Sequence, residues 1–524
     1  MKRALAGHAL ILTGTALLNR FADMFFTVYI SNKIGPEGMG LLQLILSVYF
    51  AAAVISTSGI SMAVIRLVSE ETGRGSEKNA RFVLKKSCIL SLYLSVFAAL
   101  ALFFFSGPIG NDILRDGRTV SALKFLAPSL PFMGISSCIR GYFHGVKNTV
   151  KPSSSLLLEQ LIRFLSTAVL LEVMLPKGLE YACIAASCGS VISEAGACLY
   201  LILLYRFEKR KRMSGSGPRG IIKRIAAVCF PLAASSYVRS FLNTVENIMI
   251  PAGLEKFGAS PKASLEQYGI LKGMAMPLLI FPSVFLSSVS TILIPVISEA
   301  NVLQQKNKIR YVITRVIQFT SLLSVLIAGL FILFAGDLGV LIYRSAEVGP
   351  VLFKLAPLVP LIYLDFATDG MLIGLNQQVS SLKYNVLDSM LKVGLLFVLI
   401  PKMGVDGLIL VLFCTKILNM TLSIGRLLMV SKLKLQLMNC IIKPVFSIVA
   451  AGFAAAFLYR STASCKIHNG AMLALEMIPV IAVYFLLLIL TGCIKTDDID
   501  WFKSIFRNKS APHIAGETAG RSLR

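Results

Sequence analysis

Long apolar runs separated by short polar segments make up almost the whole chain. Each run holds about twenty residues, the length that a helix needs to cross a hydrocarbon core of about 30 Å. The pattern predicts an all-α polytopic membrane protein with about 14 transmembrane helices. The predicted spans lie at residues 9–30, 40–64, 87–106, 122–140, 153–175, 181–205, 225–250, 269–294, 313–335, 350–373, 384–400, 406–429, 444–460 and 471–492.

Composition agrees with a membrane protein and argues against a soluble one. Of the 524 residues 56% are hydrophobic and 15% are charged, and the mean hydropathy is +0.75. A soluble domain with this balance would expose large apolar patches to water. The sequence contains no Walker-type phosphate loop, no HExxH helix, no nucleophile elbow and no CxxC pair. We therefore expect neither an enzyme nor a protein that carries a cofactor or a metal.

The net charge of +25 follows the predicted topology. Placing both termini in the cytoplasm puts about 34 Lys and Arg residues inside and about 12 outside. This excess predicts a multi-pass protein of the cell (inner or plasma) membrane with both termini cytoplasmic. The basic surface favours contact with anionic membrane lipids over nucleic acid. The basic inner segments are residues 66–86, 140–151, 206–224, 306–315 and 426–443 and the C-terminal tail.

The later part of the chain repeats the earlier part at a constant offset, since 356 − 127 and 392 − 163 both give 229. Many matches at one ungapped offset indicate a duplication. Six predicted spans, an even number, separate equivalent positions, so both copies enter the membrane from the same side. The result is two six-helix lobes from a parallel duplication plus two C-terminal helices. Matched pairs include Ala127 with Ala356, Gly141 with Gly370, Gly145 with Gly374, Glu159 with Asp388, and Arg163 with Lys392.

The duplication predicts a division of the chain into five segments. These are an N-terminal lobe at residues 1–205, a basic cytoplasmic linker at 206–224, a C-terminal lobe at 225–430, two additional helices at 431–494 and a cytoplasmic tail at 495–524. Two similar lobes that face each other across a central cavity are a common basis for alternating access.

Charged residues inside the predicted spans are the candidate functional residues. An Arg or Lys at mid-bilayer costs about 2.5–3.5 kcal/mol, so these side chains should face a hydrated cavity or a partner. Helical spacing offers a partner to three cations, in the pairs Arg20 with Asp23, Glu159 with Arg163, and Asp388 with Lys392. Such pairs either neutralise each other and join helices or present charge to a ligand. The presence of a pair at Glu159/Arg163 and again at Asp388/Lys392 favours a structural role for both.

Other intramembrane charges lack such a partner. Lys272 has no acid at i±3 or i±4, and Arg239 has only the polar Asn243 before Glu246. We therefore expect Arg239 and Lys272 to bind substrate, and we interpret Lys416 as structural or close to the interface. Asp365 and Asp369 lie one turn apart, and neighbouring carboxylates can hold a proton or Na⁺. Candidates for ion coupling are Glu246, Asp365 and Asp369.

Several motifs resemble those of stage V sporulation protein B-like proteins, which belong with the polysaccharide flippases of the multidrug/oligosaccharidyl-lipid/polysaccharide (MOP) exporter superfamily. The resemblance covers essentially the whole chain. The motifs are Arg140-Gly-Tyr-Phe-His-Gly145, Pro152, Glu159-Gln160-x-x-Arg163, Ile34-Gly-Pro-Glu-Gly-Met-Gly-Leu-Leu-Gln43 and the stretch from Gly59 to Glu70.

The resemblance implies two lobes in a V shape around a cavity that opens to one side at a time. It implies transport of a lipid-linked glycan or a similar anionic amphiphile to the outer leaflet, and we expect a monomer. Lipid II flippases of this superfamily use cations of the first span and the central cavity. By position, Arg20, Asp23 and Arg239 best match that role. The alternatives are an H⁺- or Na⁺-coupled multidrug antiporter of the same superfamily and a non-transporting scaffold for envelope assembly.

Overall fold

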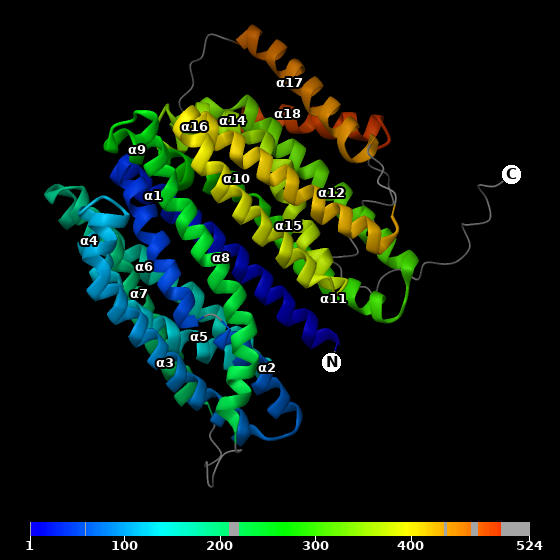
Figure 1. Ribbon diagram of the computed structural model, residues 1–524. Helices are drawn as coiled ribbons and strands as arrows, with labels where there is room; N and C mark the ends of the chain where they lie inside the picture. Colours follow the sequence, from blue (N-terminus) through cyan, green and yellow to red (C-terminus); the bar gives the residue numbers. More distant parts are fainter. Residues whose placement is uncertain (1, 58, 209–219, 434–437, 463–469, 494–524) are drawn as a thin grey trace.

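The computed structural model describes residues 2–57, 59–208, 220–433, 438–462 and 470–493. The regular elements in these ranges are all helices (Figure 1), which confirms the all-α membrane fold. The predicted tail at 495–524 and most of the linker at 206–224 lie outside the described residues. The α-helices are α1 (Lys2–Thr57), α2 (Ile60–Gly73), α3 (Glu77–Pro108), α4 (Arg118–Leu126), α5 (Ser129–Gly145), α6 (Val150–Met174), α7 (Leu179–Arg206), α8 (Ile221–Phe257), α9 (Pro261–Tyr268), α10 (Met276–Ile280), α11 (Ser283–Val302), α12 (Lys306–Leu333), α13 (Ala335–Tyr343), α14 (Val348–Leu355), α15 (Val359–Gly374), α16 (Gln378–Ser431), α17 (Lys443–Thr462) and α18 (Gly470–Leu490).

Each predicted span falls on one helix or on a run of two or three consecutive helical segments. By length and apolar composition, seven helices of the described chain can cross a membrane, or eight if the bent pair α4–α5 forms one span. The segments α1–α2 and α16 each contain two predicted spans, because their backbones continue through a kink. The number fourteen therefore stays a prediction.

Glycine allows the kinks within the two longest helices. Gly35 has a φ of 69° and is followed by Pro36, and Gly404 has a φ of 59°. A left-handed backbone at these points is accessible to glycine at little cost, whereas a side chain would strain it. The chain can thus reverse or bend at a membrane surface without a long loop.

The helix boundaries follow the offset of 229 that the sequence predicts. Helix α3 begins at Glu77 and α12 at Lys306, and 306 − 77 is 229. Left-handed residues outside glycine recur at the same distance, at Arg115 (φ 57°) with Arg344 (φ 52°) and at Lys147 with Asn376 (both φ 62°). The repeat is therefore a property of the backbone as well as of the sequence.

Helix packing also repeats. A Cβ on Gly145 of α5 would lie 2.7 Å from Val68 Cβ of α2, and one on Gly374 of α15 would lie 3.1 Å from Ile297 Cβ of α11. Val68 and Ile297 are again 229 positions apart. The same close crossing, of α2 with α5 and of α11 with α15, thus exists in both halves.

Helices α1 and α8 occupy the middle of the molecule. In Figure 1 they run side by side between the blue-to-cyan helices of the first half and the green-to-yellow helices of the second half. Helix α1 contacts α9 and the short π-helix η3 (Gly269–Ala275), whereas α8 contacts α2 and α3. Each of the two helices therefore packs against the opposite half. Helices α17 and α18 lie against α12 at the outside of the second half.

Candidate functional site

The first group of charges, named here the N-terminal cluster, joins α5 to α6. One carboxylate, Glu159, accepts from two guanidinium groups, with Arg140 Nη2 at 2.6 Å and Arg163 Nη2 at 2.9 Å. The side chain of Glu159 is only 8% exposed, against 19% for Arg140 and 25% for Arg163. Arg140 also donates to Ser155 Oγ at 3.0 Å. A nearly buried carboxylate between two arginines is a strong charge-assisted contact between helices.

Arg140 is a correction to the sequence analysis. The prediction ended a span at residue 140 and assigned residues 140–151 to a basic inner segment, but α5 continues to Gly145 and carries Arg140 within it. The turn between α5 and α6 is accordingly short. The partner that holds Arg140 inside the helix bundle, Glu159, lies 19 residues away and could not be recognised by helical spacing.

Helix α1 contributes a further carboxylate next to this cluster. Asp23 accepts a hydrogen bond from the side-chain amide of Gln160 on α6, and it interacts electrostatically with Arg163 and Arg20. Arg20 is exposed, and it forms no hydrogen bond or ion pair with any residue that the structure describes. The predicted residues Arg20, Asp23, Glu159 and Arg163 thus gather where α1 meets α6.

The second group, named here the α8–α16 cluster, contains Glu246, Lys272, Asp388 and Lys392. Lys272 Nζ of η3 donates to Glu246 Oε1 of α8 at 2.7 Å. Lys392 Nζ of α16 lies 3.4 Å from Glu246 Oε2 and 3.5 Å from Asp388 Oδ2. Glu246 and Asp388 are buried, at 5% and 4% exposed. Two residues predicted for different roles, Lys272 for substrate and Glu246 for ion coupling, are therefore partners in the folded chain.

Asp23 and Glu246 occupy equivalent places in the two repeats. Gly35 ends the first part of α1 with a φ of 69°, and Gly258 ends α8 with a φ of 113°. The differences 258 − 35 and 246 − 23 are both 223, six less than the offset elsewhere. The second repeat has six extra residues, 259–264, in the α8–α9 turn and the start of α9, and they explain the change. The first helix of each repeat thus carries an acid that interacts with a basic residue in the fifth span of the same repeat. The pairs are Asp23 with Arg163 and Glu246 with Lys392.

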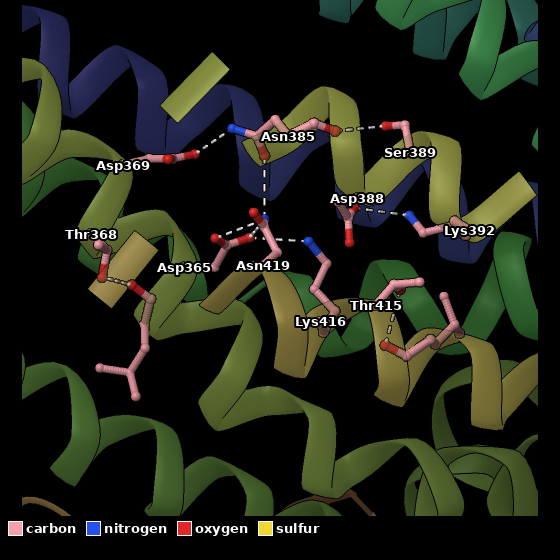
Figure 2. A network of polar contacts seen from close by, with 12 residues as sticks. Asp365, Thr368, Asp369, Asn385, Asp388, Ser389, Lys392, Thr415, Lys416 and Asn419 are labelled. Atoms are coloured by element: carbon pink, nitrogen blue, oxygen red, sulfur yellow. Dashed lines mark hydrogen bonds and ion pairs between the residues drawn. The ribbon is translucent and has the colours of Figure 1, made fainter. Parts of the chain in front are cut away.

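The third group, named here the α15–α16 network, links the predicted acids Asp365 and Asp369 to α16 (Figure 2). Lys416 Nζ donates to Asp365 at 3.0 Å, and Asn419 Nδ2 lies 3.1 Å from both oxygens of the same carboxylate. The partners of Asp369 are uncharged, with Ser381 Oγ at 2.6 Å and Asn385 Nδ2 at 3.2 Å. Within the described residues this network holds two carboxylates and one ammonium.

Arg239 of α8, like Arg20 of α1, is a cation without a close partner among the described residues. It is exposed and forms no hydrogen bond or ion pair with the described residues. Both arginines lie on the helices between the halves. Phe21, next to Arg20, packs edge-on against Phe281 of the second half with ring centroids 4.9 Å apart. Thr244 of α8 donates to Ser47 O of α1 at 3.1 Å.

Residue types and helical spacing located most of these groups, but they did not identify the uncharged partners of the predicted acids, among them two asparagines. Asn385 and Asn419, which hold the predicted acids in the α15–α16 network, were not singled out. Their position inside apolar spans, on the helix faces that carry Asp388 and Lys416, was the signal that could have identified them.

The sequence and the fold both match known proteins. Residues 5–301 match the family described as polysaccharide biosynthesis protein. Stage V sporulation protein B of Bacillus subtilis (strain 168) is 27% identical over 506 residues, which cover 95% of this chain and 97% of that protein. The lipid II flippase MurJ of the same organism is 24% identical over 447 residues, covering 78% and 80% of the two chains.

Two solved structures share the fold at low sequence identity. The lipid II flippase MurJ in its inward closed conformation gives a TM-score of 0.68 at 14% identity, over 94% of this chain and all of that one. An inward-facing multidrug resistance MATE family transporter of the MOP superfamily gives 0.64 at 15% identity, over 81% and 99%. These likenesses show the fold.

Proposed function

The chain belongs to the polysaccharide biosynthesis protein family, and from that membership we propose that it is a membrane flippase. Its substrate is a lipid-linked oligosaccharide or a similar cell-wall or polysaccharide precursor. The chain moves this substrate from the inner to the outer leaflet by alternating access between two lobes, residues 1–205 and 225–430. The equivalent helix boundaries of the two repeats support this division. So do its relatives, which include a protein named lipid II flippase.

The proposal rests on the observation that two arginines in membrane spans lack a close carboxylate partner. Arg163, Lys272, Lys392 and Lys416 each have a carboxylate partner. Arg20 and Arg239 are exposed and form no hydrogen bond or ion pair with the described residues, and Asp23 interacts with Arg20 only at longer range. An unpaired guanidinium in a membrane span is costly against lipid, so it needs water or an anion. A planar guanidinium binds phosphate oxygens well, which suits a lipid diphosphate head.

The location of these arginines fits a substrate that passes between the lobes. Arg20 lies on α1 and Arg239 on α8, the two helices that run between the halves (Figure 1). The anionic head binds these cations while the lipid tail stays in the bilayer. With the cell interior negative, outward movement of two negative charges through the full field releases about 4.6 kcal/mol per 100 mV. The membrane potential can therefore drive transport without ATP.

The test is a flipping assay with the purified full-length chain in lipid vesicles. The vesicles contain a fluorescent lipid-linked oligosaccharide, and a membrane-impermeant reagent destroys the label in the outer leaflet. We expect loss of more than half of the initial fluorescence with the protein and close to half without it. Equal loss in both preparations would contradict a flippase and favour a scaffold for envelope assembly.

A second candidate function is an H⁺- or Na⁺-coupled antiporter. It is supported by Asp369, a carboxylate whose described partners, Ser381 and Asn385, are uncharged. A half-buried carboxylate without a cationic partner can take up a proton or Na⁺ during transport. Ion-driven efflux of a cationic drug from the same vesicles would favour this function over the flippase.

A further inference from the structure

The α8–α16 cluster contains equal numbers of buried acids and bases. Glu246 is 5% exposed and Asp388 is 4% exposed. The side chain of Lys272 is 18% exposed and that of Lys392 is 12% exposed. Two carboxylates and two ammonium groups give this cluster no net charge. Carboxylates at this depth need cations close by, because burial of an unpaired charge is strongly unfavourable.

Lys272 supplies the shortest contact in the cluster. Its Nζ donates to Glu246 Oε1 at 2.7 Å, whereas Lys392 Nζ divides its contacts between Glu246 Oε2 at 3.4 Å and Asp388 Oδ2 at 3.5 Å. The remaining oxygen, Asp388 Oδ1, is buried and has no hydrogen-bond partner within the described residues. Figure 2 shows the side chain of Asp388 with one oxygen turned away from Lys392. The cluster therefore keeps an oxygen that could bind a cation.

Comparison of the repeats separates the roles of the two lysines. Lys392 has a basic counterpart in the first half, since Arg163 lies 229 positions before it. Lys272 has none, because the position 229 before it is Gln43. The two acids Asp23 and Glu246 are equivalent, but Asp23 receives a neutral amide from Gln160. Lys272 is thus an additional cation of the second half, which has no counterpart among the acids and bases that the two halves share.

We infer that Lys272 is a built-in counter-ion whose ammonium group takes the place of a monovalent cation at Glu246, beside Asp388, which Lys392 joins to Glu246. Carboxylate oxygens from two helices at mid-membrane are suitable ligands for Na⁺. A Na⁺ ion added to the present cluster would leave a buried excess positive charge, and it would compete with an ammonium group that the chain itself supplies. The site therefore binds no exchangeable Na⁺ while Lys272 is present, and it gains one when that side chain loses its charge.

This inference changes the predicted roles of both residues. Lys272 serves Glu246 and is not a ligand for the substrate, and Glu246 is not available for ion coupling. The consequence for energy supply rests on the proposed flippase function. A flippase without an exchangeable cation at Glu246 draws no energy from a Na⁺ gradient at this site, which leaves the membrane potential acting on the substrate's own charge unless Asp369 binds a cation.

The experiment measures Na⁺ binding and is independent of transport. Purified full-length protein is heated in NaCl or in choline chloride at equal ionic strength, and ²²Na⁺ binding is measured at equilibrium. For the wild type we expect equal melting temperatures and no saturable binding that depends on Glu246. For Lys272→Gln we expect a melting temperature that rises with NaCl to a plateau, together with saturable ²²Na⁺ binding. Lys272→Arg should behave as the wild type.

Two further variants show where Na⁺ binds. The double variant Lys272→Gln/Glu246→Gln should lose the Na⁺ effect. Lys354→Gln removes a lysine from the exposed pair with Asp406 and should gain no effect. If Lys272→Gln can be purified only in NaCl, that result also supports the inference.

Either of two results would overturn the inference. One is saturable Na⁺ binding to the wild type that disappears in Glu246→Gln, a comparison that remains possible if Lys272→Gln cannot be purified. The other is a folded Lys272→Gln variant with no response to Na⁺. Neither result bears on the flipping assay, so the inference and the proposed function can fail separately.

Discussion

Gly40 and Gly269 bring the backbones of the two repeats into direct contact. A Cβ on Gly40 would lie 2.1 Å from Leu265 O, and a Cβ on Gly269 would lie 2.0 Å from Pro36 O. The differences 269 − 40 and 265 − 36 are both 229. The contact of Gly40 with Leu265 is therefore equivalent to the contact of Gly269 with Pro36 when the two repeats are exchanged. It marks the place where the two halves meet around their approximate two-fold axis, and the absence of a side chain at both positions makes it possible.

Substitution of either glycine should therefore destabilise the junction of the two halves. We expect Gly40→Ala and Gly269→Ala each to lower stability by about 1–3 kcal/mol, because the obstructing atoms belong to the backbone and cannot rotate away. Thermal unfolding of the purified protein in detergent measures the effect. Gly394→Ala is the matched control, since a Cβ there meets nothing within 4 Å. Equal melting temperatures for Gly40→Ala and this control would show that the contact is looser than described.

Charge reversal at Arg20 and Arg239 tests the proposed substrate site. We expect Arg20→Glu/Arg239→Glu to abolish flipping while leaving expression unchanged, because neither arginine forms a hydrogen bond or ion pair with the described residues. The melting temperature should fall only slightly, since a carboxylate at position 20 would repel Asp23. Replacement of both by Lys should retain part of the activity, since Lys keeps the charge but loses the planar donor pair. The control Lys177→Glu/Lys402→Glu reverses two exposed charges outside the proposed site. Unchanged flipping by the Arg20→Glu/Arg239→Glu variant would remove these residues from the site.

Glu159 should contribute mainly to stability. In Glu159→Gln, Arg140 and Arg163 lose the carboxylate that they share. Loss of one member of a buried ion pair typically costs about 3–5 kcal/mol, and the partial exposure of both arginines places the expected cost at the lower end. The exposed pair Lys33–Glu172 gives the control, since Glu172→Gln should cost less than about 1 kcal/mol. A melting temperature of Glu159→Gln no lower than that of Glu172→Gln would argue against a structural role.

Much of the fold could be predicted from the sequence, because the length of each apolar run and the offset between the repeats can be read directly from the order of the residues. The offset of 229 reappears in helix boundaries and in left-handed residues such as Arg115 and Arg344. The equivalence of Asp23 and Glu246 could not be found by an ungapped comparison, since the second repeat has six extra residues at 259–264, in the α8–α9 turn and the start of α9.

Side-chain partners between helices were harder to predict than the fold. Lys272 appears unpaired at helical spacing, yet it meets Glu246 26 residues away. Arg140 meets Glu159 across the α5–α6 turn. Such contacts depend on how neighbouring helices rotate about their axes, which a periodic pattern does not fix to within one side chain. Residue types therefore identified the charged positions but not their pairing.

Asp369 distinguishes the flippase from the ion-coupled antiporter. Asp369→Asn removes a carboxylate whose described partners are the uncharged Ser381 and Asn385, so no cation is left unpaired. Asp365→Asn, by contrast, takes the carboxylate from Lys416 and should lower the melting temperature. For a flippase driven by the charge of its substrate, we expect Asp369→Asn to retain flipping within about twofold, a change of less than about 0.5 kcal/mol. An antiporter that uses Asp369 would lose ion-driven drug efflux in the same variant. Asp406→Asn, which alters an exposed carboxylate paired with Lys354, should leave either activity unchanged and serves as the control.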